Sequence, residues 1–356
     1  MEVTNNIFEK YIDTVIDKNR YYDFCISKNS DERINELYKT ISNEVMLKSN
    51  LYYPNELYEC FKKQLVKFYY LNNVNVLELG SGTESIICTI NNIILKDKTV
   101  GVVTPHFYRI SETIQKLVLI NGEFSVNSMF VDVEYIEKYI QNYSIDAIWI
   151  SNPNSIVGFG YEKESLKYLI NKYPNVLFIF DETNIEFYSE CDELTMISEL
   201  EKNLNTVVIR SCSKFFGVPG ARIGVISTYN EDIMKSYVKM NPTFPVSGSS
   251  IQFAALAFKN YSLFRNLAKD INDTKRILKK MFQKVNDINL HNSLSNIIYL
   301  TSDKYNLWDE FKARGILTMK YNDLNYKSAV RVTIHSDMLL KEILLEKISD
   351  ILELRY

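Results

Sequence analysis

The sequence of 356 residues has few cysteines, little net charge and no long apolar segment. Its five cysteines form an odd set without closely spaced pairs, which predicts reduced thiols instead of disulfides or a zinc site. A net charge of −3 offers no basic field for nucleic acid or an anionic membrane. No apolar run approaches the roughly 20 residues that span a bilayer, and the first residues do not resemble a signal peptide. We therefore expect a cytoplasmic protein that acts on small molecules, without nucleic acid, membrane or metal.

Short apolar runs alternate with helical stretches through the middle of the chain. Five runs rich in β-forming residues occur at 99–103, 146–151, 176–181, 206–211 and 222–227. Such runs, separated by helices, predict an α/β fold with a mostly parallel sheet covered on both faces. From Ser249 the pattern predicts a long helix, β-like runs and a final amphipathic helix to Tyr356. The expected domains are a large one at 46–250 and a small α+β one at 251–356, with an N-terminal arm at 1–45 that joins the small domain.

The most informative segment reads SCSKFFGVPGARIG and runs from Ser211 to Gly224. A lysine on a short loop beside an arginine can lose its proton and attack an aldehyde, which makes Lys214 a candidate for a Schiff base. Ser211, Ser213 and Arg222 supply hydroxyl donors and a forked cation that suit a phosphate. The segment predicts a pyridoxal phosphate pocket. Taken alone, it is also compatible with a plain loop between two strands.

This pattern of serine, lysine and Gly-x-Arg-x-Gly resembles the fold type I aminotransferases that depend on pyridoxal 5'-phosphate. The likeness is greatest to the histidinol-phosphate aminotransferase branch, which includes decarboxylating relatives that act on phosphorylated amino acids. Matching segments follow in family order from Tyr53 to Arg331. The resemblance implies a large domain with a seven-stranded, mostly parallel sheet, a smaller C-terminal domain and a homodimer.

The string Gly80 to Glu84 forms a glycine turn that leads into an apolar helix. Unpaired backbone N–H groups and the positive end of the helix dipole at such a turn favour a phosphate. No Gly-Lys-Ser/Thr follows, so the string is not a P-loop, and a plain helix start explains it equally well. The resemblance implies that Gly82 and Thr83 hold the cofactor phosphate.

Two side chains at strand ends suit the ring of the cofactor. Phe107 follows the run at 99–103, and Asp181 ends the run at 176–181. An aromatic face can stack on a flat ring, and a shielded carboxylate keeps a pyridine nitrogen protonated. By themselves, the phenylalanine could be core and the aspartate a helix cap. The resemblance implies stacking for Phe107 and the pyridine contact for Asp181, while His106 receives no role.

The sequence departs from the family at both residues that hold the phenolic oxygen of the cofactor. Asn184 stands where the family has tyrosine, in the run DETNIEF. Ser155 replaces the second asparagine of the family's Asn-Pro-Asn-Asn-Pro-Thr-Gly run, here NPNSIVG. We predict that Asn184 and Asn154 contact this oxygen, with Ser155 as the alternative to Asn154. Asparagine cannot ionise, so the reaction itself can differ from that of the family.

Two further residues concern the substrate and the partner subunit. Arg331 lies in a β-like run, where its planar guanidinium can clamp a carboxylate, although a surface ion pair is the structural alternative. The resemblance implies the clamp and hence an amino acid or keto acid substrate. Tyr53 and Pro54 predict a break between two helices, and the resemblance implies that Tyr53 reaches the cofactor of the neighbouring subunit.

The combined residues predict a pyridoxal-phosphate-dependent aminotransferase in which Lys214 also acts as the general base at the α-carbon of the substrate. The substrate is expected to be an amino acid or a phosphorylated amino compound. Decarboxylation of an amino acid such as an O-phosphorylated one is the alternative, followed by elimination or cyclisation. The segment DFCISKNSDER lacks the proline-rich loop of the branch, which argues against ordinary histidine biosynthesis. A binding protein that has lost its chemistry is the remaining hypothesis.

Overall fold

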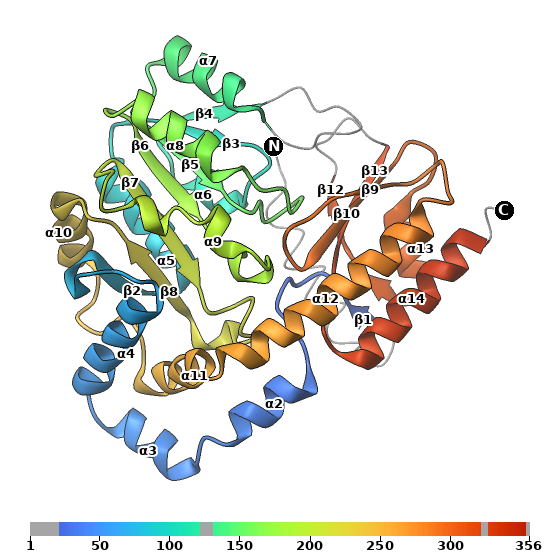
Figure 1. Ribbon diagram of the computed structural model, residues 1–356, viewed down its shortest axis with the longest axis horizontal. Helices are drawn as coiled ribbons and strands as arrows, with labels where there is room; N and C mark the ends of the chain where they lie inside the picture. Colours follow the sequence, from blue (N-terminus) through green and yellow to red (C-terminus); the bar gives the residue numbers. More distant parts are fainter. Residues whose placement is uncertain (1–20, 122–130, 322–326, 354–356) are drawn as a thin grey trace.

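A seven-stranded sheet forms the centre of the larger domain (Figure 1). The structure is a computed structural model and describes residues 21–121, 131–321 and 327–353. In spatial order, the strands of this sheet are β2 (Leu77–Ser81), β8 (Ile223–Ser227), β7 (Thr206–Ser211), β6 (Leu177–Asp181), β5 (Ala147–Ser151), β3 (Thr99–Val103) and β4 (Lys116–Ile120). β8 pairs antiparallel with both of its neighbours, and the other pairs are parallel.

The five strands expected from the sequence are confirmed, to within one residue at their ends. Strands β2 and β4 were not predicted. β2 has five residues and ends in the glycine turn before a helix, so the sequence indicates only the start of that helix. β4 lies at the edge of the sheet and pairs only with β3, so it shows little of the continuous burial that marks the central strands.

Helices cover both faces of the large sheet. Successive side chains of a strand point to opposite faces, and in β5 Trp149 joins one buried cluster whereas Ile148 and Ile150 join the other. The cluster with Trp149 is closed by α5 (Gly82–Thr89), α6 (Tyr108–Glu112) and α10 (Glu231–Met240). The opposite cluster is closed by α4 (Asn55–Phe68), α7 (Val133–Tyr143), α8 (Lys163–Lys172), α11 (Gly248–Lys259) and α12 (Tyr261–Phe282). The expected double cover of the sheet is confirmed.

Two helical stretches of the sequence are each divided once more than expected. The stretch before Tyr53 forms α2 (Glu32–Lys39) and α3 (Asn43–Leu51), because Ser42 caps α3 by accepting a hydrogen bond from the Val45 backbone. The long segment after Ser249 forms α11 and α12, which are separated at Asn260. The predicted break at Tyr53 and Pro54 is confirmed between α3 and α4.

The smaller C-terminal domain contains an antiparallel sheet with the order β12-β13-β10-β9. Its strands are β9 (Asn289–His291), β10 (Ile297–Ser302), β12 (Met319–Tyr321) and β13 (Ser328–Thr333). The N-terminal strand β1 (Tyr22–Asp23) pairs with β11 (Ile316–Leu317), so residues from both ends of the chain meet in this domain. Residues 1–20 of the expected arm and 354–356 of the last helix lie outside the described residues.

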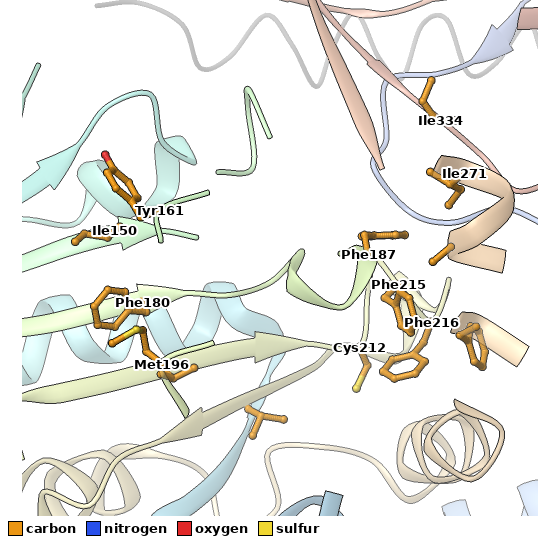
Figure 2. Close-up of a cluster of buried hydrophobic side chains, with 14 of the residues drawn as sticks. Ile150, Tyr161, Phe180, Phe187, Met196, Cys212, Phe215, Phe216, Ile271 and Ile334 are labelled. Atoms are coloured by element: carbon orange, nitrogen blue, oxygen red, sulfur yellow. The ribbon is translucent and has the colours of Figure 1, made fainter. Parts of the chain in front are cut away.

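Three helices remain: α9 (Cys191–Leu194), α13 (Leu307–Ala313) and α14 (Met338–Glu353). The long helix α12 runs beside both domains in Figure 1. The hydrophobic core extends along α12 from one domain to the other. In Figure 2, Phe215 and Phe216 of the large domain belong to the same buried cluster as Ile271 of α12 and Ile334. Within the described part of the chain, every helix is too short or too polar to cross a membrane.

Candidate active site

The candidate site lies where the parallel strands of the large sheet end. Ser151 of β5 is the register partner of Asp181 of β6, and Ser211 ends the next strand, β7. Carboxyl ends of parallel strands lie at one edge of a sheet, which is where α/β proteins place their ligands. The candidate residues at the ends of β6 and β7 are therefore brought together by the strand order.

The loop that carries Lys214 is anchored on both sides of the lysine. Phe215 and Phe216 follow it directly and are fully buried, with ring centroids 5.1 Å apart. Figure 2 shows them in the same cluster as Phe187. The backbone N–H of Asn29 donates to the Lys214 carbonyl at 2.8 Å. The main chain of Lys214 is thus held by core packing and by the N-terminal segment, while its side chain stays partly exposed.

The charge of Lys214 is destabilised by its surroundings. Burial, and after it the nearby cations Arg331 and Arg222, together lower the pKa of its ammonium group to about 8. Asp181 acts in the opposite direction and favours the charged form. The neutral amine, which is the nucleophilic form, is therefore accessible near neutral pH. Arg331, Arg222 and Asp181 thus come close enough to act on Lys214 by their charge, although they lie in other parts of the chain.

Asp181 is a buried carboxyl group, with 4% of its surface exposed. Burial raises its pKa, whereas bonds from Thr183 and the charge of Lys214 lower it. Both the backbone N–H of Thr183, at 3.1 Å, and the Thr183 hydroxyl donate to Oδ1 of Asp181. A cation placed against this carboxylate would stabilise its ionised form, as a protonated pyridine does.

The glycine turn before α5 lies directly against β8. A Cβ on Gly224 would come within 2.6 Å of the Gly82 carbonyl carbon and 2.7 Å of the Thr83 nitrogen. Gly82 has φ +78°, and a Cβ there would lie 2.5 Å from Nη2 of Arg222, so the guanidinium covers the turn. The backbone N–H of Ser213 donates to Oγ of Ser211 at 3.0 Å, which fixes the two serines relative to each other. The turn, the serines and Arg222 form one cradle of hydrogen-bond donors of the kind that binds phosphate.

The loop after β5 uses Asn154 for its own structure. Nδ2 of Asn154 donates to the Pro105 carbonyl at 2.6 Å, and its Oδ1 accepts from the backbone of Ile156 and Val157. The hydroxyl of Ser155, in contrast, is buried without a hydrogen-bond partner. The Asn154 amide thus makes three bonds within the protein and keeps one N–H of Nδ2, whereas the Ser155 hydroxyl is wholly unused. The bond to Pro105 places this loop beside the segment of Phe107, which is partly buried.

Two more buried groups have an atom without a partner. Asn184 is 3% exposed, and its Oδ1 has no hydrogen-bond partner. Arg331 donates through Nη1 to the Ser155 carbonyl at 2.9 Å and through Nη2 to the Cys25 carbonyl at 2.8 Å, whereas its Nε has none. Buried polar atoms are nearly always paired in folded proteins. Orphan atoms on residues from distant parts of the chain mark a place for a polar ligand.

Sequence reasoning placed most candidates at this edge but missed several contacts. Thr183, Asn29 and the Cys25 carbonyl hold Asp181, Lys214 and Arg331 in place, as described above. Thr183 could have been found from its position next to Asp181, but the other two belong to no motif. Tyr53 lies on the surface with 84% exposure, and the centroid of its ring lies 5.8 Å from that of Phe244.

The chain is similar to proteins of a known family over most of its length. The model of the family "aminotransferase class I and II" matches residues 20–348. The chain belongs to this family. Histidinol-phosphate aminotransferase from Caldanaerobacter subterraneus subsp. tengcongensis is 24% identical over 294 residues, which is 80% of each protein. As a member of the family, the protein is an enzyme, an aminotransferase whose cofactor is pyridoxal 5'-phosphate.

Solved structures confirm the fold. The histidinol-phosphate aminotransferase from Clostridium acetobutylicum is 18% identical with a TM-score of 0.80, over 93% of this chain and 99% of that one. The enzyme of the same name from Sinorhizobium meliloti, in complex with pyridoxal-5'-phosphate, is 13% identical with a TM-score of 0.78, over 94% and 91%. The expected fold type I architecture of this aminotransferase is therefore confirmed.

The residues present fit this cofactor. The donor cradle at Gly82 suits its phosphate, the buried Asp181 suits its ring nitrogen, and the orphan atoms of Ser155 and Asn184 are polar groups that its phenolic oxygen can pair. When bound, pyridoxal 5'-phosphate supplies an electron-accepting ring that stabilises negative charge at the α-carbon of an amino substrate.

Proposed function

We propose that the protein transfers the amino group of an amino acid or phosphorylated amino compound, with Lys214 as its central residue. The observation that carries this proposal is the meeting of a lysine of lowered pKa, a buried carboxylate and two arginines at one strand edge. A neutral amine is needed both to bind an aldehyde and to accept a proton. The lowered pKa of Lys214 makes the neutral amine available for both tasks at far lower pH than an exposed lysine allows.

The residues around Lys214 divide the work of binding. We assign Gly82, Thr83, Ser211, Ser213 and Arg222 to the cofactor phosphate. Their backbone N–H groups, hydroxyls and guanidinium form the cradle described above, and phosphate binding by such donors is strong because it is charge-assisted. The role of Arg222 is further supported by its position against the glycine turn.

A second set of residues faces the ring and the substrate. Asp181 is assigned to the ring nitrogen and Phe107 to one face of the ring. Ser155 and Asn184 are assigned to the phenolic oxygen, because the buried Ser155 hydroxyl has no partner and the buried Asn184 can donate from its amide nitrogen. Neither side chain can ionise, so they hold this oxygen by neutral hydrogen bonds alone.

Arg331 is assigned to the carboxylate of the substrate. Two of its N–H groups are used by backbone carbonyls, which fix the plane of the guanidinium, and its Nε remains without a partner. During the reaction, Nζ of Lys214 accepts the proton of the substrate α-carbon and later returns it. The neighbouring positive charge of Arg331 keeps Nζ from holding that proton too tightly, because like charges lower the pKa of an ammonium group.

The test is an absorbance experiment with purified, cofactor-loaded protein. Single amino compounds are added, namely glutamate, other common amino acids, histidinol phosphate and O-phosphorylated amino acids. Conversion of the cofactor to its pyridoxamine form by one of them is the expected result. Release of carbon dioxide, or a dehydrated product with the original spectrum restored, would instead establish decarboxylation or elimination. Lys214→Ala should show neither the visible band of the bound cofactor nor any conversion.

We also propose a cytoplasmic homodimer in which Tyr53 reaches the site of the partner subunit. Tyr53 is joined on the surface by other exposed apolar side chains of the same region, Val45, Leu47, Leu51 and Tyr52. Large apolar side chains exposed within one short stretch of chain favour a contact with another protein there. We further propose a large domain at 46–250 and a small one at 251–356 that includes residues 1–45, and the pairing of β1 with β11 supports the place of the N-terminal segment. Leu47→Asp should yield monomers in analytical ultracentrifugation, whereas a dimeric Leu47→Asp protein would contradict the interface.

A further inference from the structure

A second pocket lies outside the candidate active site, between α12 and the segment that follows β9. Its volume is about 380 Å³, which is within the range of small-molecule sites. One wall is a row of α12 side chains, and another is formed by His291 to Leu294. Tyr188 and Ser189, just after the turn η3 (Ile185–Phe187), form a third part of the lining.

Positive charge is concentrated in this pocket. Four cations line it but only one carboxylate, that of Asp273, although the whole chain has a net charge of −3. The cations are Lys269, Lys275, Arg276 and Lys279. Arg276 is paired with Asp273, and Nζ of Lys279 donates to Oδ1 of Asn292 at 3.1 Å. Cations held close together in a concave site favour an anion that can contact several of them.

Lys275 is the deepest of these cations. Its Nζ donates to the Ser293 carbonyl at 2.8 Å and to the Ser295 carbonyl at 2.7 Å, and no carboxylate pairs with it among the residues that the structure describes. Burial lowers its pKa to about 8. An ammonium group has three donors, so one N–H remains after the two carbonyl bonds. A shielded cation without a counter-charge gains stability when an anion enters the pocket.

The pocket wall is also continuous with the active-site loop. The Leu294 backbone N–H donates to the Gly158 carbonyl at 2.7 Å. A Cβ on Gly158 would clash with the Ser293 side chain, so the two segments are in direct contact. Gly158 belongs to the loop that carries Ser155, whose carbonyl accepts from Arg331.

The opposite part of the lining is tied to the other cofactor segment. Arg265 of α12 donates to the carbonyls of Glu186, Tyr188 and Ser189, at 2.6, 2.9 and 2.7 Å. This segment begins only two residues after Asn184. Two walls of the pocket thus continue into the two chain segments that we assign to the phenolic oxygen of the cofactor.

We infer that this pocket binds a compact polyanion, such as a phosphate ester or pyrophosphate, and that the bound anion alters the active site through residues 293–294 and 186–189. The anion would bridge Lys275 and Lys279 and so fix the segment after β9. Because coupling between two sites is reciprocal, a ligand that orders this segment changes the affinity or the spectrum of the group held by the loop at Ser155. The coupling rests on the proposed placement of the cofactor, whereas the binding does not.

The binding test is calorimetric titration of the cofactor-loaded protein with inorganic pyrophosphate at constant ionic strength. Lys279→Gln and Lys280→Gln form a matched pair, because they are exposed neighbours on α12 that remove the same charge, and Lys280 does not line the pocket. We expect saturable binding that Lys279→Gln weakens at least about tenfold and Lys280→Gln leaves unchanged. Equal affinities of the two variants, or no saturable binding, would overturn the site. Pyrophosphate that binds only at Arg331 would give such equal affinities, because neither variant changes that residue.

The coupling test follows the visible absorbance of the bound cofactor during the same titration. Pyrophosphate should shift the band or its pH dependence in the original protein and in Lys280→Gln, but not in Lys279→Gln at the same concentration. Saturable binding with an unchanged spectrum would overturn the coupling and leave the anion site standing. Absence of a visible band in every sample would instead contradict the proposed function, so the two failures are distinguishable.

Discussion

Replacement of Gly224 by alanine should damage the phosphate cradle without touching any catalytic side chain. The added Cβ would lie 2.6 Å from the Gly82 carbonyl carbon, 2.7 Å from the Thr83 nitrogen and 2.8 Å from the Gly82 oxygen. These are backbone atoms, which cannot rotate away as a flexible side chain can. Gly224 is also held between Gly80 and Ser211 in the sheet, so β8 has little freedom to retreat.

The size of the effect follows from these distances. Ordinary carbon contacts lie near 3.5 to 4.0 Å, so the turn at Gly82 must move by roughly 1 Å. Overpacking of this kind lowers the free energy of unfolding by about 1–3 kcal/mol. A shift of the turn also removes at least one charge-assisted hydrogen bond to the phosphate, worth about 1.5–3 kcal/mol. The dissociation constant of pyridoxal 5'-phosphate should therefore rise by roughly 10- to 100-fold.

Gly220→Ala is the matched control. No heavy atom lies within 4 Å of a Cβ at this position, which is exposed and lies in the turn four residues before Gly224. Cofactor affinity is measured by titrating the cofactor-free protein while following its visible absorbance, and stability is measured by urea unfolding. Gly220→Ala should match the original protein in both. If Gly224→Ala also binds the cofactor with the original affinity, the cradle is not where the phosphate lies.

Three further predictions concern the centre of the site. The rate at which cofactor-free protein captures the cofactor should rise through about pH 8, because the neutral amine of Lys214 forms there and not at its ordinary pKa of 10.5. Arg331→Gln removes a nearby cation and should move this midpoint upward. An unmoved midpoint in rapid-mixing measurements would contradict the electrostatics. Arg331→Gln should also raise KM for amino acids by about 10- to 100-fold with a smaller effect on kcat, whereas an unchanged KM in steady-state assays would place the substrate carboxylate elsewhere. Asn154→Ala should lower the free energy of unfolding by about 1–3 kcal/mol, because it leaves buried backbone groups unpaired. Ser155→Ala should alter the absorbance of the bound cofactor at nearly unchanged stability in urea unfolding. If instead Asn154→Ala alters the absorbance and Ser155→Ala does not, Asn154 is the cofactor contact.

Particular elements show why the sequence predicted some parts and not others. Strand β5 is apolar from Ala147 to Ile150, and such a run predicts a buried parallel strand without any knowledge of its neighbours. Strand β9 has three residues, and β1 has two, and both exist only because β10 and β11 offer them partners. The division of one long helical segment at Asn260 was missed for a related reason, since a helix end inside a polar and apolar rhythm has no strong signal of its own.

The candidate site shows the same division. Lys214, Asp181 and Arg222 lie in motifs whose chemistry can be read from a few adjacent residues, because the turn and strand end that present them are local structures. The choice between Asn154 and Ser155 could not be read in this way. It also involves the Pro105 carbonyl, which lies 49 residues away along the chain and accepts one N–H of the Asn154 amide.

The sequence by itself thus determined the family, the fold class and the cofactor, since these depend on short motifs and on the rhythm of apolar residues. Only the tertiary structure decided which side chains are free to act. It brought Arg331 to Lys214, fixed its guanidinium on two distant carbonyls and gathered the cations of α12 around a pocket. The physical reason is that hydrogen-bond partners, burial and pKa values depend on atoms that are close in space but far apart in the chain.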